Sequence, residues 1–160
     1  MIAIRPARQD DRAFVTATAR RLSAFGPPPW RTEDEVVAGE LRTIEAFFAA
    51  PEPAAALLIA ESSGGERLGF IYLQELQDYF TGERHGHIGI VAVAAAFEGS
   101  GAGKALMVAA ESWARAQGYR TITLSVFEHN RRARGVYEHF GYAADTIRYL
   151  KVLNPSRTET

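Results

Sequence analysis

Residues 91–107 read VAVAAAFEGSGAGKALM and place a glycine-rich turn between an apolar strand and an amphipathic helix. Leu106, Ala110 and Trp113 share one face of that helix, and Gly118 stands where it should end. Glycines at such a turn let backbone N–H groups converge on an anion, and the start of the helix adds a favourable field. The stretch therefore predicts a pyrophosphate site, although a flexible turn without a ligand would have the same composition.

Three well-known glycine motifs do not fit this turn. A P-loop requires Ser or Thr after its Gly-Lys pair and a glycine five residues before the second glycine, but these positions hold Ala105 and Glu98. A dinucleotide fingerprint needs a third glycine, which would fall on Lys104 or Leu106. Ser100 stands directly between two glycines, so the G-x-S-x-G nucleophile elbow is absent. A nucleotide-binding module is therefore only a minor alternative.

A second stretch, residues 126–142, reads VFEHNRRARGVYEHFGY and is expected to contain a helix that ends at Gly141. Together the two stretches resemble the GNAT superfamily of acetyl-CoA-dependent N-acetyltransferases. The family's loop, Gln/Arg-x-x-Gly-x-Gly/Ala, matches at 98–103 except that Glu98 replaces Gln or Arg. Its later signature, N-x-x-A-x-x-x-Y followed by G-[FY], matches at Asn130, Ala133, Tyr137, Gly141 and Tyr142. The resemblance covers 57–153 well, and residues 1–50 only in the order of their elements.

The resemblance implies where acetyl-CoA would lie. Its pyrophosphate would rest on the glycine turn. The strand before this turn and the next strand would part at their ends, and the pantetheine arm would pair with the exposed backbone groups as an additional strand does. A backbone N–H near Val93 would polarise the thioester carbonyl, and Glu98 would point away from the phosphates. Asn130 is equally suited to cap its helix, and the two roles are compatible. The cofactor-contacting residues implied in this way are Val91, Ala92, Val93, Gly99, Ser100, Gly101, Ala102, Gly103, Lys104, Asn130, Ala133 and Tyr137.

The implied reaction is attack of a neutral amine on the thioester, with a thiolate as the leaving group. The resemblance places Tyr137 beside the sulfur as its proton donor, and the alternative is a plain core tyrosine. Many family members carry a glutamate as general base where this sequence has Gly89. The candidate bases are therefore Glu75 and His87, of which His87 titrates near neutrality. An ordinary strand-end charge, a structural histidine and a water-borne proton are the alternatives to these two assignments.

Periodicity and turn signals predict one domain over residues 1–154 and a frayed tail at 155–160. A T-x-x-E capping box at Thr32 and Glu35 begins the second helix, and Pro51 ends it. Strands are expected at 2–5, 56–60, 68–76, 87–93, 121–127 and 147–153, and helices at 10–22, 33–50, 104–117 and 130–140. This order, β-α-α-β-β-β-α-β-α-β, predicts an α/β (α+β) fold with a mixed, mainly antiparallel central sheet and helices on both faces.

Composition argues against several other classes of protein. The 160 residues carry 18 Lys and Arg against 19 Asp and Glu, a formal charge of −1 without the basic excess of a nucleic-acid binder. There is no cysteine, and the histidines show no metal-site spacing, so neither a thiolate nucleophile nor a metal is expected. No stretch is long and apolar enough for a signal peptide or a membrane span, which predicts a cytoplasmic protein without a membrane partner.

The acceptor is expected to be an amine-bearing small molecule or peptide. Trp30, Tyr79 and Phe80 are candidate walls of its pocket, with local packing as the alternative. The strand expected at 147–153 could pair with a second copy in a homodimer. The main competing function is a non-catalytic acyl-CoA-binding regulatory domain on the same fold, which the missing strand glutamate favours and Tyr137 opposes.

Overall fold

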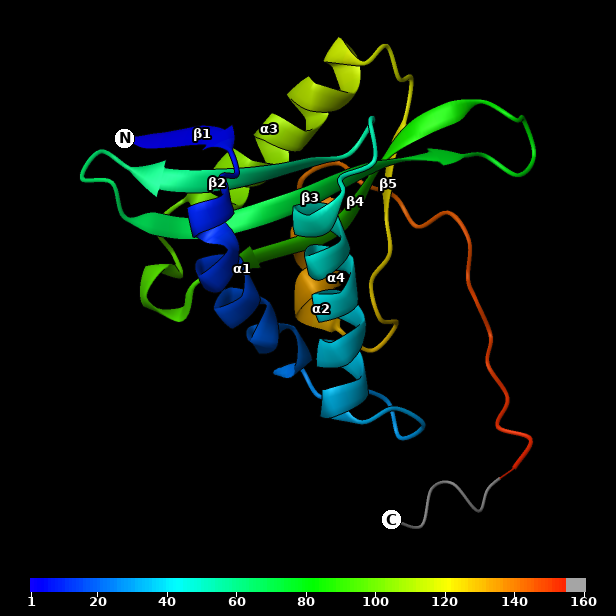
Figure 1. Cartoon of the computed structure of the whole chain (residues 1–160). Coiled ribbons are helices and arrows are strands. Elements are labelled where there is room, and N and C mark those ends of the chain that lie inside the picture. The colour runs from blue at the N-terminus through cyan, green and yellow to red at the C-terminus, as the bar shows by residue number, and fades with distance from the viewer. Residues whose placement is uncertain (155–160) are drawn as a thin grey trace.

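A computed structural model describes residues 1–154, so the tail expected at 155–160 lies outside the described residues. Its centre is a five-stranded sheet in the order β1-β2-β3-β4-β5, in which the first four strands are antiparallel and β5 is parallel to β4. The strands are β1 (Ile2–Pro6), β2 (Ala56–Ser62), β3 (Arg67–Gln77), β4 (Arg84–Val93) and β5 (Ile122–Leu124). The mixed, mainly antiparallel sheet predicted from the sequence is confirmed (Figure 1).

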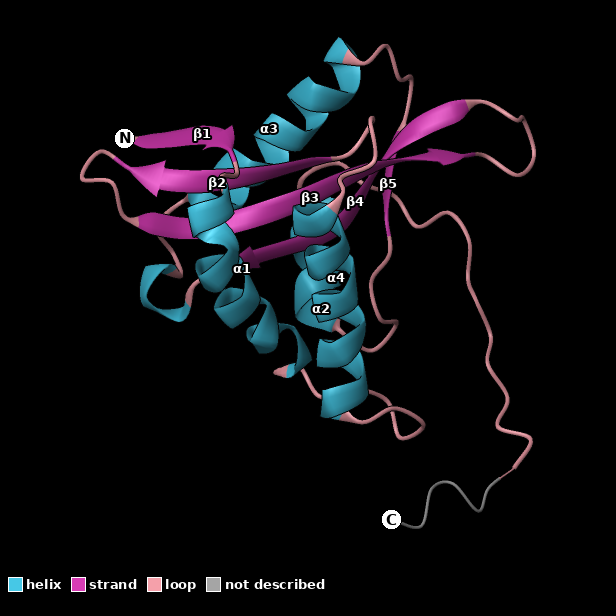
Figure 2. Ribbon diagram, in the orientation of Figure 1, coloured by secondary structure: helices cyan, strands magenta, loops and turns pink. Residues whose placement is uncertain are grey.

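Helices cover both faces of this sheet (Figure 2). On one face α1 and α2 pack around Ile44 and Phe70. On the other face α3 packs around Leu106, together with Tyr137 of α4 and with Phe140, the residue that follows α4. The α-helices are α1 (Arg12–Ala19), α2 (Glu33–Ala49), α3 (Ala102–Ala116) and α4 (Arg131–His139), with 3-10 turns at Gln9–Asp11, Arg20–Ser23 and Ala95–Phe97. None of the described helices is both long and apolar enough to cross a membrane.

Local signals set where α2 and α4 begin. The Thr32 hydroxyl accepts a hydrogen bond from the Glu35 N–H at 3.1 Å, and the Glu35 carboxylate accepts one from the Thr32 N–H at 3.0 Å. These two bonds confirm the capping box. Asn130 Oδ1 accepts from the Ala133 N–H at 3.2 Å and caps α4. Gly141 follows α4 with a φ of 91°, a conformation that glycine adopts without steric cost.

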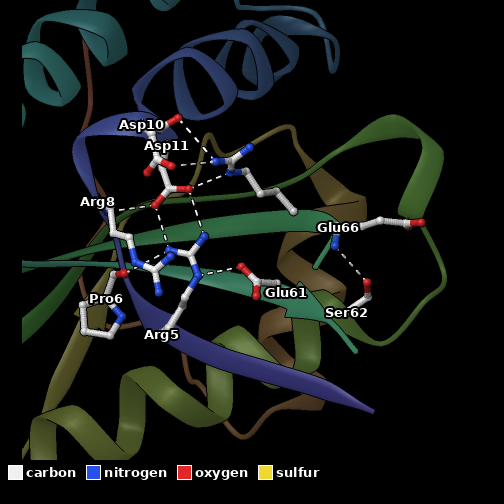
Figure 3. A network of polar contacts seen from close by, with 9 residues as sticks. Arg5, Pro6, Arg8, Asp10, Asp11, Glu61, Ser62 and Glu66 are labelled. Atoms are coloured by element: carbon white, nitrogen blue, oxygen red, sulfur yellow. Dashed lines mark hydrogen bonds and ion pairs between the residues drawn. The ribbon is translucent and has the colours of Figure 1, made fainter. Parts of the chain in front are cut away.

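A buried carboxylate joins the first helical turn to the sheet (Figure 3). Asp11 is fully buried and pairs with Arg5 of β1 at 2.8 Å and with Arg67 of β3 at 2.6 Å. It also accepts a hydrogen bond from the Arg8 N–H at 2.7 Å, and Arg5 pairs in turn with Glu61 of β2 at 2.6 Å. Hydrogen bonds from Arg5 hold the pKa of Asp11 well below its usual range. The network ties the start of the chain to three strands.

The expectation of a last strand at 147–153 is wrong. Within the described residues this segment pairs with no strand, and it runs away from the sheet as a loop (Figure 1). Its apolar side chains are exposed, Tyr149 at 89% and Leu153 at 83%. Alternating apolar residues favour a strand, but a strand forms only where the backbone groups of a neighbour face it. β5 is also shorter than the expected 121–127, because its pairing with β4 stops at Leu124.

Candidate active site

A β-bulge interrupts β4. Tyr72 of β3 pairs with Ile90 and the next residue, Leu73, pairs with Ile88, so Gly89 has no partner on β3. Residues two apart on a regular strand share a face, but here Ile88 packs on the α3 side of the sheet and Ile90 on the α1–α2 side. A Cβ on Gly89 would lie 2.9 Å from Tyr72 Cδ1. The packing of Tyr72 thus leaves no room for the carboxylate that the family resemblance places at this position.

β4 and β5 part next to the bulge. Their parallel pairing covers Gly86 to Ile88 on β4 and stops at Leu124 on β5. From Gly89 to Val93, the edge of β4 that faces away from β3 has no strand beside it within residues 1–154. Unpaired N–H and C=O groups along such an edge can bind an extended ligand as an added strand would be bound.

A cavity of about 120 Å³ lies where the two strands part. Residues of α2 and α4 line it together with the bulge of β4 and residues 125–127 after β5. Four of the residues expected to contact the cofactor meet here, namely Val91, Asn130, Ala133 and Tyr137. The structure therefore brings the beginning of the first sequence stretch and the core of the second to one place.

Tyr137 has the properties of a proton donor. It is half-buried on α4, and its ring stands edge-on to Tyr142 with centroids 6.3 Å apart. Burial raises the pKa of its phenol above the ordinary value of 10.0, so the phenol keeps its proton at neutral pH. Asn130 caps the same helix through the Ala133 N–H and thereby helps to fix the orientation of Tyr137 at the cavity.

The glycine turn prepares the start of α3 for an anion. Gly99 and Gly101 have φ of 77° and 91°, values that residues with side chains rarely adopt. Ser100 Oγ accepts from the Ala102 N–H at 3.3 Å, and the Ala105 N–H donates to the Gly101 carbonyl at 3.0 Å. The N–H groups of the residues between Ala102 and Ala105 are ones that the start of a helix leaves unbonded, so they can donate to a ligand or to water. Of the remaining expected contacts, Ala92 and Ala102 are buried, Val93 and Gly103 are half-buried, and Gly99, Ser100, Gly101 and Lys104 are exposed.

Glu98, where the loop departs from the family pattern, is paired with a cation. Its carboxylate lies 2.5 Å from Arg21 Nη2, and this contact lowers its pKa below the ordinary value of 4.5. Arg21 belongs to the 3-10 turn after α1, and its Nη1 also donates to the Val93 carbonyl. A guanidinium thus lies beside the glycine turn, although the loop has Glu98 where the family pattern has Gln or Arg.

Neither base proposed from the sequence lines the cavity. Glu75 accepts a hydrogen bond from Tyr119 and pairs with Arg84 at 2.6 Å, and both contacts lower the pKa of its carboxyl. His87 Nδ1 lies 2.8 Å from the Thr123 hydroxyl, and burial lowers the pKa of its imidazole. Structural contacts hold both side chains, so their assignment as bases stays a prediction that this geometry does not favour.

Two groups that sequence reasoning missed do line the cavity. Glu40 comes from α2, and Phe25 stacks on Phe127 with centroids 5.0 Å apart. Spacing gave no signal for either group, because Glu40 stands outside the apolar repeat of its helix and the partner of Phe25 lies far along the chain. The aromatic residues that were expected as pocket walls are exposed and do not line this cavity: Trp30, Tyr79 and Phe80.

A mixed sheet whose fourth and fifth strands part at a cavity, with a glycine turn opening the next helix, characterises an acyl-CoA-dependent N-acyltransferase. Residues 17–142 match the sequence profile of the acetyltransferase (GNAT) family. The chain belongs to this family, whose members typically use acetyl-CoA. The fold and family expected from the two motifs are confirmed.

Individual relatives agree with this placement. Over 111 residues the chain is 34% identical to an uncharacterised N-acetyltransferase, YhfO, of Bacillus subtilis (strain 168), a match covering 68% of this chain and 74% of that protein. It is 31% identical over 140 residues to a mycothiol acetyltransferase of Amycolatopsis mediterranei (strain U-32), covering 84% of this chain but only 43% of that longer protein. Among solved structures, a protein of Pyrococcus furiosus assigned as an acetyl transferase matches with a TM-score of 0.77 at 22% identity, covering 96% of this chain and 100% of the other.

Proposed function

We propose that this protein moves the acetyl group of acetyl-CoA to a primary amine of a small molecule or peptide. Transfer is direct, with both substrates bound at once in a ternary complex. One observation carries the proposal: Tyr137, a phenol that burial keeps protonated, lines the cavity where the unpaired edge of β4 begins. Direct transfer is also supported by composition, because the sequence offers no cysteine to carry an acyl group.

The residues of the groove suit acetyl-CoA. The glycine turn offers backbone N–H groups to a pyrophosphate, and the exposed Lys104 in the first turn of α3 supplies positive charge near it. The edge of β4 from Gly89 to Val93 has no strand beside it within the described residues. Apart from the Val93 carbonyl, which accepts from Arg21, its outward backbone groups offer strand-like hydrogen bonds to the amides of a pantetheine arm. An arm that followed this edge from the turn would bring its thioester to the cavity beside Tyr137.

The chemistry then follows from the groups present. The amine nitrogen attacks the thioester carbonyl carbon, a C–N bond forms, and the C–S bond breaks when the tetrahedral intermediate collapses. Tyr137 donates its phenolic proton to the departing sulfur, so that a thiol leaves rather than a thiolate. A backbone N–H near Val93 stabilises the negative charge that develops on the carbonyl oxygen.

Thiol release from acetyl-CoA, measured over a panel of amines, tests the proposal. Release should require an amine, and mass spectrometry should find one acetyl group on the product. Intersecting double-reciprocal plots are expected for a ternary complex, whereas parallel lines would indicate an acyl-enzyme and contradict direct transfer. Calorimetric binding of CoA without acetylation of any amine would favour the non-catalytic regulatory domain.

A further inference from the structure

One acidic residue of α2 lies beside the apolar stripe of this helix, on the side that lines the cavity. Val36, Glu40 and Ile44 follow one another at intervals of four residues and so share one face of the helix. Ile44 is fully buried in the core, while Val36 and Glu40 are half-buried at the cavity between β4 and β5. A carboxylate that is half-buried beside an apolar helix face and lines a cavity is uncommon and points to a function.

The Glu40 carboxylate has no hydrogen-bond or ion-pair partner in the described part of the chain. Burial alone raises its pKa above the ordinary value of 4.5. Among the described residues that line the cavity, only Glu40 and Tyr137 ionise. Two polar side chains that adjoin lining residues in the sequence are held elsewhere, because Arg21 pairs with Glu98 and His129 Nε2 lies 2.6 Å from the Gly26 carbonyl oxygen. Such a carboxylate is available to a substrate.

Glu40 and Tyr137 reach the cavity from opposite faces of the sheet. Glu40 belongs to α2, which packs with Ile44 on the α1–α2 side, whereas Tyr137 packs against the cluster around α3. A thioester lying between the parted strands would have a carboxylate on one side and a phenol on the other. Aminolysis of a thioester needs a base where the nucleophile enters and an acid beside the leaving sulfur, and this pair meets both needs.

We propose that Glu40 accepts the proton that the amine loses during attack, and that the acceptor is a primary amine with one positive charge carried on an apolar or aromatic group. The inference rests on the proposed function. The amine binds beside Glu40 as an ammonium group, releases one proton to solvent, and then reacts in its neutral form. As the C–N bond forms, an N–H proton passes to the Glu40 carboxylate, and as the C–S bond breaks, the sulfur takes the proton of Tyr137. Glu40 then releases its proton to water and Tyr137 recovers one, so the amide and the free thiol are the products.

The lining of the cavity determines the class of amine. One carboxylate compensates one ammonium group during binding, whereas a polyamine or an aminoglycoside would bring further charges that no carboxylate of the described lining can pair. An apolar or aromatic group next to the amine would instead be buried against aliphatic and aromatic side chains. The side chains that offer this surface are Leu22, Phe25, Val36, Val126 and Phe127.

The test compares Glu40→Gln with the wild type in acetylation of 2-phenylethylamine, with spermidine and kanamycin as polycationic comparators. For the wild type, kcat should fall on the acid side of its pH profile, and kcat/KM should be roughly tenfold higher for phenylethylamine than for either polycation. Glu40→Gln should lower kcat by roughly 10²-fold and change the acid limb to the one that ionisation of the amine alone produces, without changing the calorimetric affinity for CoA. The matched control is Glu33→Gln, at an exposed position in the first turn of the same helix, which should behave as the wild type.

Each outcome decides between the two levels of the proposal. If the wild type acetylates these amines and Glu40→Gln keeps both its kcat and its acid limb, the inference is overturned and the proposed function stands. A wild type that prefers spermidine or kanamycin overturns the substrate class. A wild type that binds CoA and acetylates no amine overturns the proposed function and the inference together. Glu40→Gln should melt no lower than the wild type at neutral pH, because it removes a partly buried charge, so lost activity would not reflect unfolding.

Discussion

Among single residues, Tyr137 permits the most direct test of the chemistry, because one oxygen can be removed while the ring remains. Tyr137→Phe should lower kcat by roughly 10²-fold, the usual scale of general acid catalysis. KM for acetyl-CoA should change little, since the lost interaction belongs to the transition state. If the tyrosine only packs, the variant would instead lose on the order of 1 kcal/mol of stability and keep its kcat. Steady-state kinetics and urea unfolding of one purified variant separate the two roles.

Asp11 gives a prediction about stability and pH. Its pKa is depressed in the folded chain, chiefly by Arg5, so its charge stabilises the fold above the unfolded value of 3.8, and this contribution is lost as the pH falls below about 5. Asp11→Asn should lower the free energy of unfolding by about 3 kcal/mol at pH 7. This is the lower end of the range for a broken buried ion pair, because Arg5 keeps its ion pair with Glu61. In urea unfolding from pH 7 to pH 2, the free energy of unfolding should depend less on pH in the variant than in the wild type. Asp10→Asn, at an exposed position, is the control, and an equal effect of both substitutions would contradict the role of the buried network.

The chemistry of single residues was predictable only where spacing along one helix determines it. The intervals from Asn130 to Ala133 and on to Tyr137 predict a cap and a shared face, and the structure confirms the cap and brings all three to the cavity. Glu40 could not be placed, because the cavity that it lines is formed with β4 and with residues after β5, far along the chain. The same limit affects Glu75, whose contacts with Tyr119 and Arg84 no spacing predicts.

At the level of elements, the bulge in β4 is the feature that separates it from a regular strand. Gly89→Ala would place a methyl group 2.9 Å from the ring of Tyr72, which itself stands edge-on to Phe47. Overpacking of this kind should cost roughly 1–3 kcal/mol in the free energy of unfolding. Gly135→Ala is the matched control, because no atom lies within 4 Å of its added methyl and alanine favours the helix by about 1 kcal/mol. If Gly89→Ala and the wild type are equally stable in urea, the Tyr72 ring moves aside at little cost in free energy.

Helices were predictable as elements because their caps and apolar periodicity are local. The capping box at Thr32 and the cap at Asn130 are both confirmed. Strands depend on what lies beside them, which is why the alternation at 147–153 predicted a strand where the chain is an exposed loop. The parting of β4 from β5 was expected only through the family resemblance, since neither strand's own sequence shows where pairing stops. A homodimer formed through 147–153 stays a prediction.

For the whole molecule, ligand binding should appear as stability. A ligand that binds only the folded chain at one hundred times its Kd adds about 2.7 kcal/mol, which corresponds to roughly 5–10 °C in Tm for a chain of this size. We expect CoA and acetyl-CoA to raise Tm, because the glycine turn and the free edge of β4 together suit a pyrophosphate that carries a pantetheine arm. ATP and NAD should raise it less, since Ala105 and Lys104 break the fingerprints that those nucleotides require.

Gly101→Val tells whether this stabilisation depends on the turn. The position is open, with Ile2 Cδ1 3.9 Å from an added Cβ, but its φ of 91° strains any side chain, so the free variant should lose roughly 1–2 kcal/mol. The added side chain also hinders the approach of a phosphate to the backbone N–H groups at the start of α3. CoA should therefore raise the Tm of the variant by much less than that of the wild type, even after allowance for the lower starting Tm. If CoA raises the Tm of the variant as much as that of the wild type, the pyrophosphate does not bind at the turn. If ATP raises Tm more than CoA does, the ligand ranking on which the proposed function depends is reversed.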